Sequence, residues 1–115
     1  MPPFKLEIEK RTGSTDAVAM YHLTGKLSLE TVNEFMQKLR PELAQHLILD
    51  LSGVTFLDSA GVGSLVSLFV NRRSHGRTFA LAALTKQSSA VVTVAGLQNL
   101  LPIYPTVEDA LSKKP

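Results

Sequence analysis

The segments Leu47-Ile48-Leu49-Asp50-Leu51 and Leu57-Asp58-Ser59-Ala60-Gly61 give the strongest structural signal in this chain. The first is almost entirely apolar, which is typical of a central strand covered on both faces. The second carries Asp58 and Ser59, two residue types that favour a helix start, and an apolar pattern of helical period follows at once. We therefore predict a buried strand that leads into a helix, with the Ser59 hydroxyl at the positive end of that helix. Negative charge is stabilised at such a position.

The remaining sequence alternates between strand-like and helix-like segments. Apolar and polar residues alternate over 4–8 and again over 17–23, which predicts an antiparallel hairpin with a turn at 11–16 and a second strand that Gly25 ends. Ser28 is a suitable cap for a helix that Pro41 ends near Arg40 or breaks into a short second turn. Further along we predict a helix from Ser59 to Arg73 closed by His75-Gly76, a strand over 78–84, a helix capped by Ser88 or Ser89 and stopped by Gly96, an edge strand over 100–104, and a short helix opened by Thr106.

This order of elements predicts an α/β fold, namely a mixed β-sheet of about five strands with four to five helices packed on it. The chain has 115 residues and shows neither an internal repeat nor a low-complexity linker. We therefore expect residues 1–115 to form a single domain.

Composition argues against several classes of protein. The chain has no cysteine, which excludes a disulfide scaffold, thiolate catalysis and cysteine-based zinc sites. Its net charge of +2 is too small to indicate direct nucleic-acid binding. No secretory leader is evident, and no apolar stretch reaches the roughly 18 residues of a membrane span. We expect a soluble cytoplasmic protein, and the sequence is silent on its oligomeric state.

Catalytic and cofactor motifs are incomplete. Ser59 and Gly61 supply half of a Gly-x-Ser-x-Gly nucleophile elbow, because position 57 is leucine. His75 is predicted at the far end of the helix that Ser59 begins, about 22 Å away, and the other histidines belong to strand regions. Gly61-Val62-Gly63 lacks the third glycine of a dinucleotide fingerprint, and no Walker-type motif or cluster of metal ligands occurs. We predict no enzymatic activity, no cofactor and no metal.

Residues 47–52, together with Phe56-Leu57-Asp58-Ser59-Ala60-Gly61-Val62-Gly63, resemble the signature of STAS domains of the anti-sigma factor antagonist type. Shorter matches at Leu23-Thr24-Gly25-Lys26-Leu27, His75-Gly76 and Ala95-Gly96-Leu97 extend the resemblance over almost the whole chain. It implies that Ser59 is phosphorylated by a partner anti-sigma factor with serine kinase activity. The unphosphorylated domain would bind that partner and free a sigma factor, and a phosphatase of the PP2C type would restore binding after phosphorylation.

Charge alone makes such a switch reasonable. A phosphate adds about −1.5 to −2 charges at pH 7 and can sit at a helix start without unfolding it. Inside a fitted interface the same charge would be desolvated or placed against acidic groups, which can cost several kcal/mol. A local modification can therefore end binding while the fold stays intact.

Each residue of the motif also has a purely structural explanation. Ser59 fits a plain helix cap, worth about 1 kcal/mol. Asp58 fits the N-cap itself, or a residue that positions Ser59 for a kinase. Ala60, Gly61 and Gly63 permit close approach, either of the helix to the sheet or of a partner to the helix start. The sequence does not separate these alternatives.

One departure from the family pattern concerns the turn after the second strand. The family usually carries an acidic residue there, where this chain has Ser28, and Lys26 adds a positive charge. The resemblance nevertheless implies a partner-binding set at these two regions: Lys26, Ser28, Asp58, Ser59, Ala60, Gly61 and Gly63. The missing acid slightly favours an alternative, in which the domain is an accessory subunit of a lipid-transport ABC system or a stress-signalling complex and is not phosphorylated. A nucleotide-binding domain, motivated by the glycines, is the second alternative.

Two further groups of residues have open interpretations. Arg72, Arg73 and Arg77 are expected to form a solvated helix end that complements the helix dipole, or else a docking patch for an acidic partner. Leu29, Val54 and Phe56 form either a contact face or part of the core.

Overall fold

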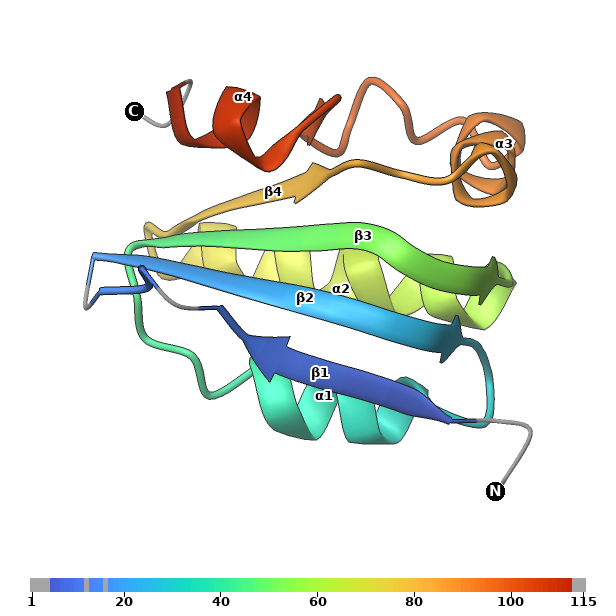
Figure 1. Ribbon diagram of the computed structural model, residues 1–115, viewed down its shortest axis with the longest axis horizontal. Coiled ribbons are helices and arrows are strands. Elements are labelled where there is room, and N and C mark those ends of the chain that lie inside the picture. The colour runs from blue at the N-terminus through green and yellow to red at the C-terminus, as the bar shows by residue number, and fades with distance from the viewer. Residues whose placement is uncertain (1–4, 12, 16, 113–115) are drawn as a thin grey trace.

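A computed structural model describes residues 5–11, 13–15 and 17–112, and in it the chain forms one mixed sheet with the strand order β1-β2-β3-β4-β5 (Figure 1). The predicted positions Phe4, Thr12 and Asp16 lie outside the described residues. The hairpin of β1 and β2 is antiparallel, as predicted, and the other neighbouring strands are parallel. The elements are β1 (Leu6–Lys10), β2 (Val18–Leu27), α1 (Val32–Leu39), β3 (His46–Leu57), α2 (Ser59–Ser74), β4 (Thr78–Ala82), α3 (Lys86–Val94), β5 (Ile103–Tyr104) and α4 (Val107–Ser112).

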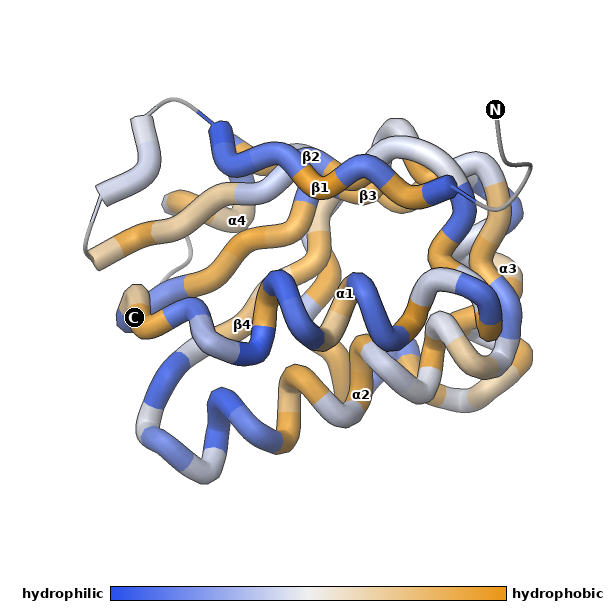
Figure 2. The backbone as a smooth tube through the Cα atoms, turned by 90° about the horizontal axis from the view of Figure 1, so that it is seen from below, coloured by the Kyte–Doolittle hydropathy of each residue, from blue (hydrophilic) through white to orange (hydrophobic). Residues whose placement is uncertain are grey.

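Helices cover both faces of the sheet, but unequally. The helices α1 and α2 lie side by side beneath the strands, and α4 lies on the other face (Figures 1 and 2). The main core, on the α1 and α2 side, includes the fully buried Leu23, Leu49 and Leu65. A smaller apolar cluster lies under α4 and includes Ile48 and Val107. β3 is central and contributes to both clusters, which explains why its residues 47–51 are almost entirely apolar. The predicted α/β fold is confirmed.

Several strand lengths differ from the predicted spans. β4 ends at Ala82 and β5 begins only at Ile103, so both are shorter than the predicted 78–84 and 100–104, whereas β2 and β3 are longer. β2 runs past Gly25, which we predicted to end it, because this glycine adopts a φ of +109° inside the strand at a shift in register with β3. A Cβ at Gly25 would collide with the carbonyl oxygen of Lys5, so the neighbouring strand also requires glycine here. β3 continues to Leu57, well beyond Leu51, and therefore ends directly beside Asp58.

Two predicted helix caps are wrong. Ser28 lies in the turn before α1, where its carbonyl oxygen accepts hydrogen bonds from the N–H groups of Thr31 and Val32 at 2.9 and 3.0 Å. α1 therefore begins only at Val32. The cap of α3 is Thr85, whose Oγ1 accepts from the N–H of Ser88 at 3.1 Å, and not Ser88 or Ser89.

The other predicted helix ends are confirmed. α1 stops at Leu39, before Pro41. Gly76 and Gly96 follow α2 and α3 in the left-handed conformation, with φ of +71° and +75°. The hydroxyl of Thr106 accepts from the N–H of Asp109 at 3.0 Å and caps α4.

We predicted that Arg72 belongs to a solvated helix end, and this prediction is wrong because its side chain is buried. Its Nε donates to the carbonyl oxygen of Thr78 at 2.8 Å, its Nη1 donates to that of Glu42 at 3.1 Å, and its Nη2 donates to that of Ala44. Burial, together with the charge of Arg77, lowers the pKa of Arg72 to about 10. Arg72 therefore ties the end of α2 to the loop before β3 and to the start of β4.

Candidate functional site

The start of α2 is capped by Asp58, the single residue between β3 and α2. Its backbone is extended, and its Oδ1 accepts a hydrogen bond from the N–H of Gly61 at 2.8 Å. Its carbonyl oxygen accepts from the N–H of Val62 at 2.9 Å. Of the two explanations offered for Asp58, the N-cap explanation is confirmed.

Ser59 is the first helical residue, so the alternative explanation of Ser59 as a plain helix cap is wrong. The side chain of Ser59 is exposed, and its hydroxyl makes no hydrogen bond to any residue that the structure describes. A free hydroxyl at the first turn of a 16-residue helix can accept a bulky anionic group without giving up an existing contact.

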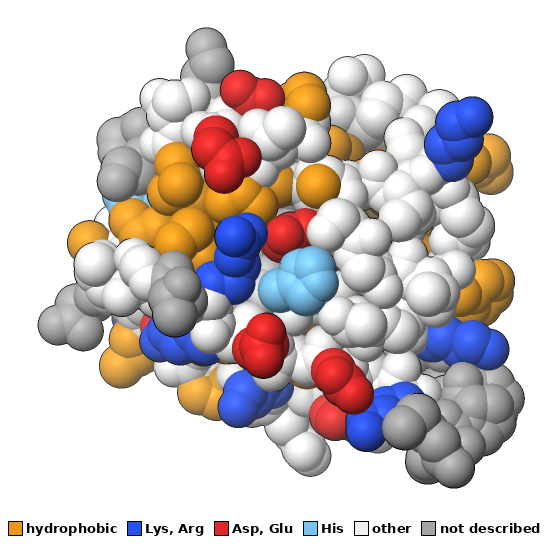
Figure 3. Space-filling model, viewed as in Figure 1, with side chains coloured by type: hydrophobic (Ala, Val, Ile, Leu, Met, Phe, Trp, Pro, Cys, Tyr) orange, Lys and Arg blue, Asp and Glu red, His pale blue; other side chains and the backbone are white. Residues whose placement is uncertain are grey.

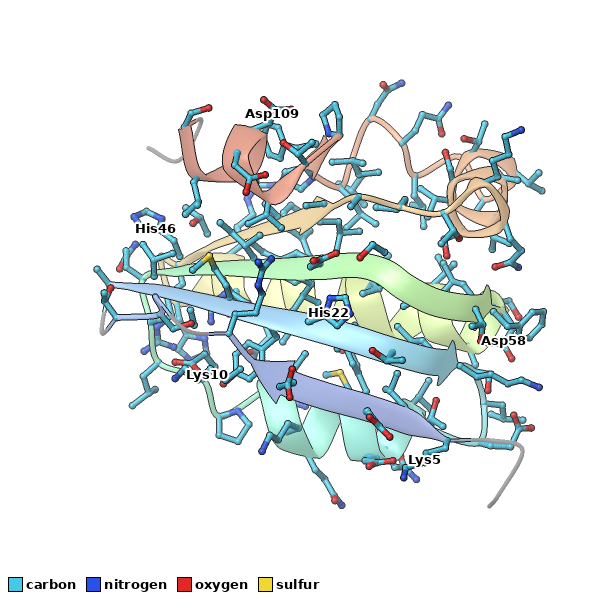
Figure 4. The ribbon with its side chains drawn as sticks, viewed as in Figure 1. Lys5, Lys10, His22, His46, Asp58 and Asp109 are labelled. Atoms are coloured by element: carbon cyan, nitrogen blue, oxygen red, sulfur yellow. The ribbon has the colours of Figure 1, made fainter. Side chains whose placement is uncertain are left out.

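The second carboxylate oxygen of Asp58 reaches a different element. Oδ2 accepts from the N–H of Leu29, in the turn between β2 and α1, at 3.1 Å. Figure 4 shows Asp58 at the end of the sheet where β2 and β3 finish. The predicted site residues on the β2–α1 turn and on the start of α2 are therefore brought together.

Gly61 and Gly63 differ in their surroundings, which separates the two explanations that the sequence left open. Gly61 is buried, and a Cβ there would collide with the carbonyl oxygen of Leu27 and with a methyl group of Leu57. It permits the helix to approach the sheet. Gly63 is exposed, and a Cβ there would meet nothing within 4 Å. Of the two glycines, only Gly63 leaves room for a partner, and Ala60, directly before Gly61, is half-buried.

The β2–α1 turn still carries an acid, although Ser28 replaces the usual one. Ser28 is buried, and its hydroxyl donates to Oε1 of Glu30 at 2.8 Å. Glu30 itself is exposed. The sequence analysis missed Glu30, although an acid two residues beyond the expected position was the available signal. Lys26 is half-buried and lies opposite Phe56 in the pairing of β2 with β3.

An apolar groove of about 680 Å³ opens between α2 and α3, and Ser59 is one of the residues that line it. Val94 lines the groove with a side chain that is 89% exposed. The side chain of Gln87 fixes α3 to β3, because it accepts from the N–H of Leu57 at 2.9 Å and donates to its carbonyl oxygen at 2.8 Å. The remaining lining residues carry no charge: Val62, Gly63, Val66, Ala90, Val91, Ala95 and Leu97.

Two exposed apolar side chains belong to residues close to Asp58. Leu29 is 68% exposed and Phe56 is 42% exposed, whereas Val54 belongs to the core. Two of the three residues with open interpretations are therefore on the surface. Single exposed apolar side chains are ordinary, so the significance of these two lies in their position near Asp58. The N–H of Leu29 donates to Oδ2 of Asp58, and Phe56 precedes Asp58 by two residues.

The histidines lie away from Ser59. His22 is in the middle of the sheet face that carries α4, and His46 is at the opposite end of the sheet from Asp58 (Figure 4). Figure 3 shows that basic, acidic and histidine side chains gather near the centre of this face. His75 is the C-cap of α2. No histidine in the described part of the chain is thus placed to activate the Ser59 hydroxyl.

His22 belongs to a polar cluster on that open face. Its Nδ1 lies 3.1 Å from Oδ2 of Asp50, and Nη1 of Arg11 donates to the same oxygen at 3.3 Å. Burial alone would raise the pKa of Asp50, but hydrogen bonds from Ser52 and His22 outweigh it and lower the pKa. These contacts explain how a central strand accommodates a carboxylate.

Among residues 5–11, 13–15 and 17–112 there is no group of three or more metal-ligating side chains and no helix long and apolar enough to cross a membrane.

The fold and the capped helix start define an α/β domain of a known class. The family model for the STAS domain matches residues 8–110, and the chain belongs to that family. It is 22% identical over 113 residues to an anti-sigma F factor antagonist from Paenibacillus polymyxa, with 95% of this chain and 93% of that protein covered. An anti-sigma factor antagonist from Mycobacterium paratuberculosis has the same fold, with a TM-score of 0.85, 24% identity, and coverage of 96% of this chain and 95% of that one.

Two further solved structures share the fold. The phosphorylated form of the Bacillus cell fate determinant SpoIIAA matches with a TM-score of 0.69 and 18% identity, covering 93% of this chain and 98% of that one. The STAS domain of a SulP transporter from Vibrio cholerae also matches with a TM-score of 0.69, at 26% identity, covering 89% of this chain and 84% of that one. The STAS fold therefore occurs both in anti-sigma factor antagonists and in transporters.

Proposed function

We propose that this chain is a non-enzymatic binding switch, an anti-sigma factor antagonist in which Ser59 is the phosphoacceptor. The observation that carries the proposal is the free, exposed hydroxyl of Ser59 at a helix start that Asp58 already caps. The unphosphorylated protein binds an anti-sigma factor that is also a serine kinase, and a sigma factor is released. Phosphorylation ends binding, and a PP2C-type phosphatase reverses it. We place this cycle in the cytoplasm.

The helix start tolerates a phosphate. Because the cap is Asp58, a phosphate on Ser59 displaces no hydrogen bond that holds the first turn. The N–H groups of Ser59 and Ala60 have no acceptor among the described residues, and they lie at the positive end of the helix dipole. The modified protein therefore keeps its fold, and the effect of the phosphate falls on binding.

The groove explains why the phosphate ends binding. Its lining is aliphatic apart from Ser59, so a partner that fills it must present apolar groups. A phosphate on Ser59 places about two negative charges at the edge of that apolar interface, where they would be desolvated without an opposite charge. Gly63 and Ala60 belong to the same docking region, and Lys26 and the exposed Glu30 supply its polar border. Ser28 is buried and contributes indirectly, because its hydroxyl donates to the carboxylate of Glu30 at 2.8 Å.

The test is phosphorylation in vitro. The purified protein is incubated with ATP and its purified cognate anti-sigma factor kinase, and the phosphate is mapped by mass spectrometry. We expect one phosphate, on Ser59, and none on the Ser59→Ala variant. Modification at a residue other than Ser59 contradicts the proposal. So does the absence of any modification when the cognate kinase is active.

A second candidate function is favoured by the similarity to a transporter STAS domain. The same groove would then hold another subunit of a lipid-transport ABC system or a stress-signalling complex, and Ser59 would not be modified. Binding that is indifferent to charge at Ser59 would support this function. The nucleotide-binding alternative has lost its motivation, because Gly61 packs against β2 and Gly63 faces an apolar groove.

A further inference from the structure

The carboxylate of Asp58 joins two separate elements. One oxygen caps α2 through the N–H of Gly61, and the other holds the N–H of Leu29 in the β2–α1 turn. We propose that Asp58 is a positioning residue for partner binding, which presents the side chain of Leu29 beside Ser59 so that the turn and the helix start form one docking surface. This inference rests on the proposed function, and it assigns to Leu29 a contact with the anti-sigma factor.

The base of the turn is locked by its own residues. The N–H of Ser28 donates to Oγ1 of Thr31 at 3.0 Å, and that hydroxyl donates to the carbonyl oxygen of Lys26 at 2.8 Å. Both Ser28 and Thr31 are buried. The tip, formed by Leu29 and Glu30, projects beyond this base and is exposed. At this tip, the backbone N–H of Leu29 donates a hydrogen bond to Asp58, which lies outside the turn.

The helix start is fixed against the same strand end. Gly61 lies against the carbonyl oxygen of Leu27, and the N–H of Asp58 donates to that oxygen at 3.4 Å. Leu27 is fully buried. The separation between α2 and the turn is thus set by close packing, and the carboxylate of Asp58 spans it. A hydrogen bond to an ionised carboxylate is stronger than one between neutral groups, so this link is well suited to immobilise Leu29.

Immobilisation gives Leu29 a role that exposure alone does not. An interface residue that is already ordered loses less conformational entropy on binding than one on a mobile loop. Leu29 combines a fixed backbone with a side chain that is 68% exposed. Both oxygens of Asp58 are already engaged by backbone N–H groups, which favours an indirect effect of Asp58 on the partner over a direct contact.

The variant Asp58→Asn separates the two roles of the carboxylate. Its one carbonyl oxygen can still cap Gly61, because asparagine is as good an N-cap as aspartate, while its NH₂ group cannot accept from Leu29. Hydrogen exchange followed by NMR should show the Leu29 amide exchanging at least tenfold faster and the Gly61 amide still protected. Asp58→Ser, which keeps a single capping oxygen, should give the same pattern. An unchanged Leu29 amide in both variants overturns the proposal.

Binding is then measured as a double-mutant cycle with Leu29→Ala. The probe is the purified cognate anti-sigma factor kinase, titrated without ATP. We expect Asp58→Asn to weaken binding at least fivefold when Leu29 is present and less than twofold in the Leu29→Ala background. An equal loss in both backgrounds means that Asp58 acts by its own charge or contact, and it overturns the proposal. If the unaltered protein itself does not bind the kinase, the proposed function fails, whereas the exchange data report on the link between Asp58 and Leu29 in either case.

Discussion

Gly61 lies so close to the carbonyl oxygen of Leu27 that no side chain fits between the start of α2 and the end of β2. Gly63, two residues later, faces open space. The variants Gly61→Ala and Gly63→Ala should therefore change stability in opposite directions. We expect Gly61→Ala to destabilise by about 1–3 kcal/mol through overpacking, and Gly63→Ala to stabilise by up to about 1 kcal/mol through helix propensity. Urea unfolding measures both, and equal effects would contradict the assigned packing.

Filling the groove should block binding without unfolding the protein. Gly63→Leu places a large side chain in the groove between α2 and α3, where there is room for it. We expect at least tenfold weaker binding of the anti-sigma factor kinase in a calorimetric titration. Ser67→Leu is the matched control, because Ser67 is exposed on the same helix but does not line the groove. The groove is not the docking site if both variants bind alike.

The Tyr21–Glu42 contact makes stability depend on pH. Burial alone would raise the pKa of Glu42, but hydrogen bonds from the Tyr21 hydroxyl at 2.6 Å, the Ala44 N–H at 3.0 Å and the Lys10 ammonium at 3.2 Å lower it to about 2. Burial, and then the contact with Glu42, raise the pKa of Tyr21. Because the folded pKa of Glu42 lies below its ordinary value of 4.5, its stabilising contribution is present above that value and is lost as pH falls toward 2.

Replacing Tyr21 by phenylalanine should reduce that contribution. Tyr21→Phe removes a hydrogen bond to a charged group and should destabilise by about 1.5–3 kcal/mol at pH 7. The difference from the unaltered protein should shrink between pH 4.5 and pH 2.5, because protonated Glu42 accepts the bond less strongly. Urea unfolding at several pH values measures this. A difference that grows on acidification would show that Glu42 is not the group concerned.

Arg72 should be needed for stability and not for recognition. Arg72→Lys replaces a fork of donors by one ammonium, which cannot reach the carbonyl oxygens of Glu42, Ala44 and Thr78 together. We expect a loss of about 2–4 kcal/mol in urea unfolding, since buried acceptors are left without donors. The exposed neighbour provides the control, and Arg73→Lys should stay within about 0.5 kcal/mol. Comparable losses at both positions would refute this role.

The sequence predicted those elements and helix ends that depend on residues close together in the chain. The buried strand before Asp58 and the helix after it follow from local apolar patterns, as do the ends of α2 and α3 at Gly76 and Gly96. The cap of α3 was also local, since Thr85 stands three residues before Ser88, and we overlooked it.

What the sequence did not reveal depends on contacts between distant residues. Gly25 continues β2 because the backbone of Lys5 lies against it, and Arg72 is buried because the loop before β3 closes over it. The different surroundings of Gly61 and Gly63 depend on where the end of β2 lies relative to α2. The groove exists only because α3 packs near α2. The link from Asp58 to Leu29 spans 29 positions of sequence.

The central claim is that negative charge at Ser59 ends partner binding while the fold persists. The most direct measurement is a calorimetric titration of the anti-sigma factor kinase with the unaltered protein, Ser59→Asp and the neutral, similarly shaped Ser59→Asn, with circular dichroism as the check on folding. We predict that Ser59→Asp binds at least tenfold more weakly, equivalent to about 1.4 kcal/mol, and that Ser59→Asn stays within about threefold of the unaltered protein. Equal affinities of Ser59→Asp and the unaltered protein, with both folded, would contradict the account.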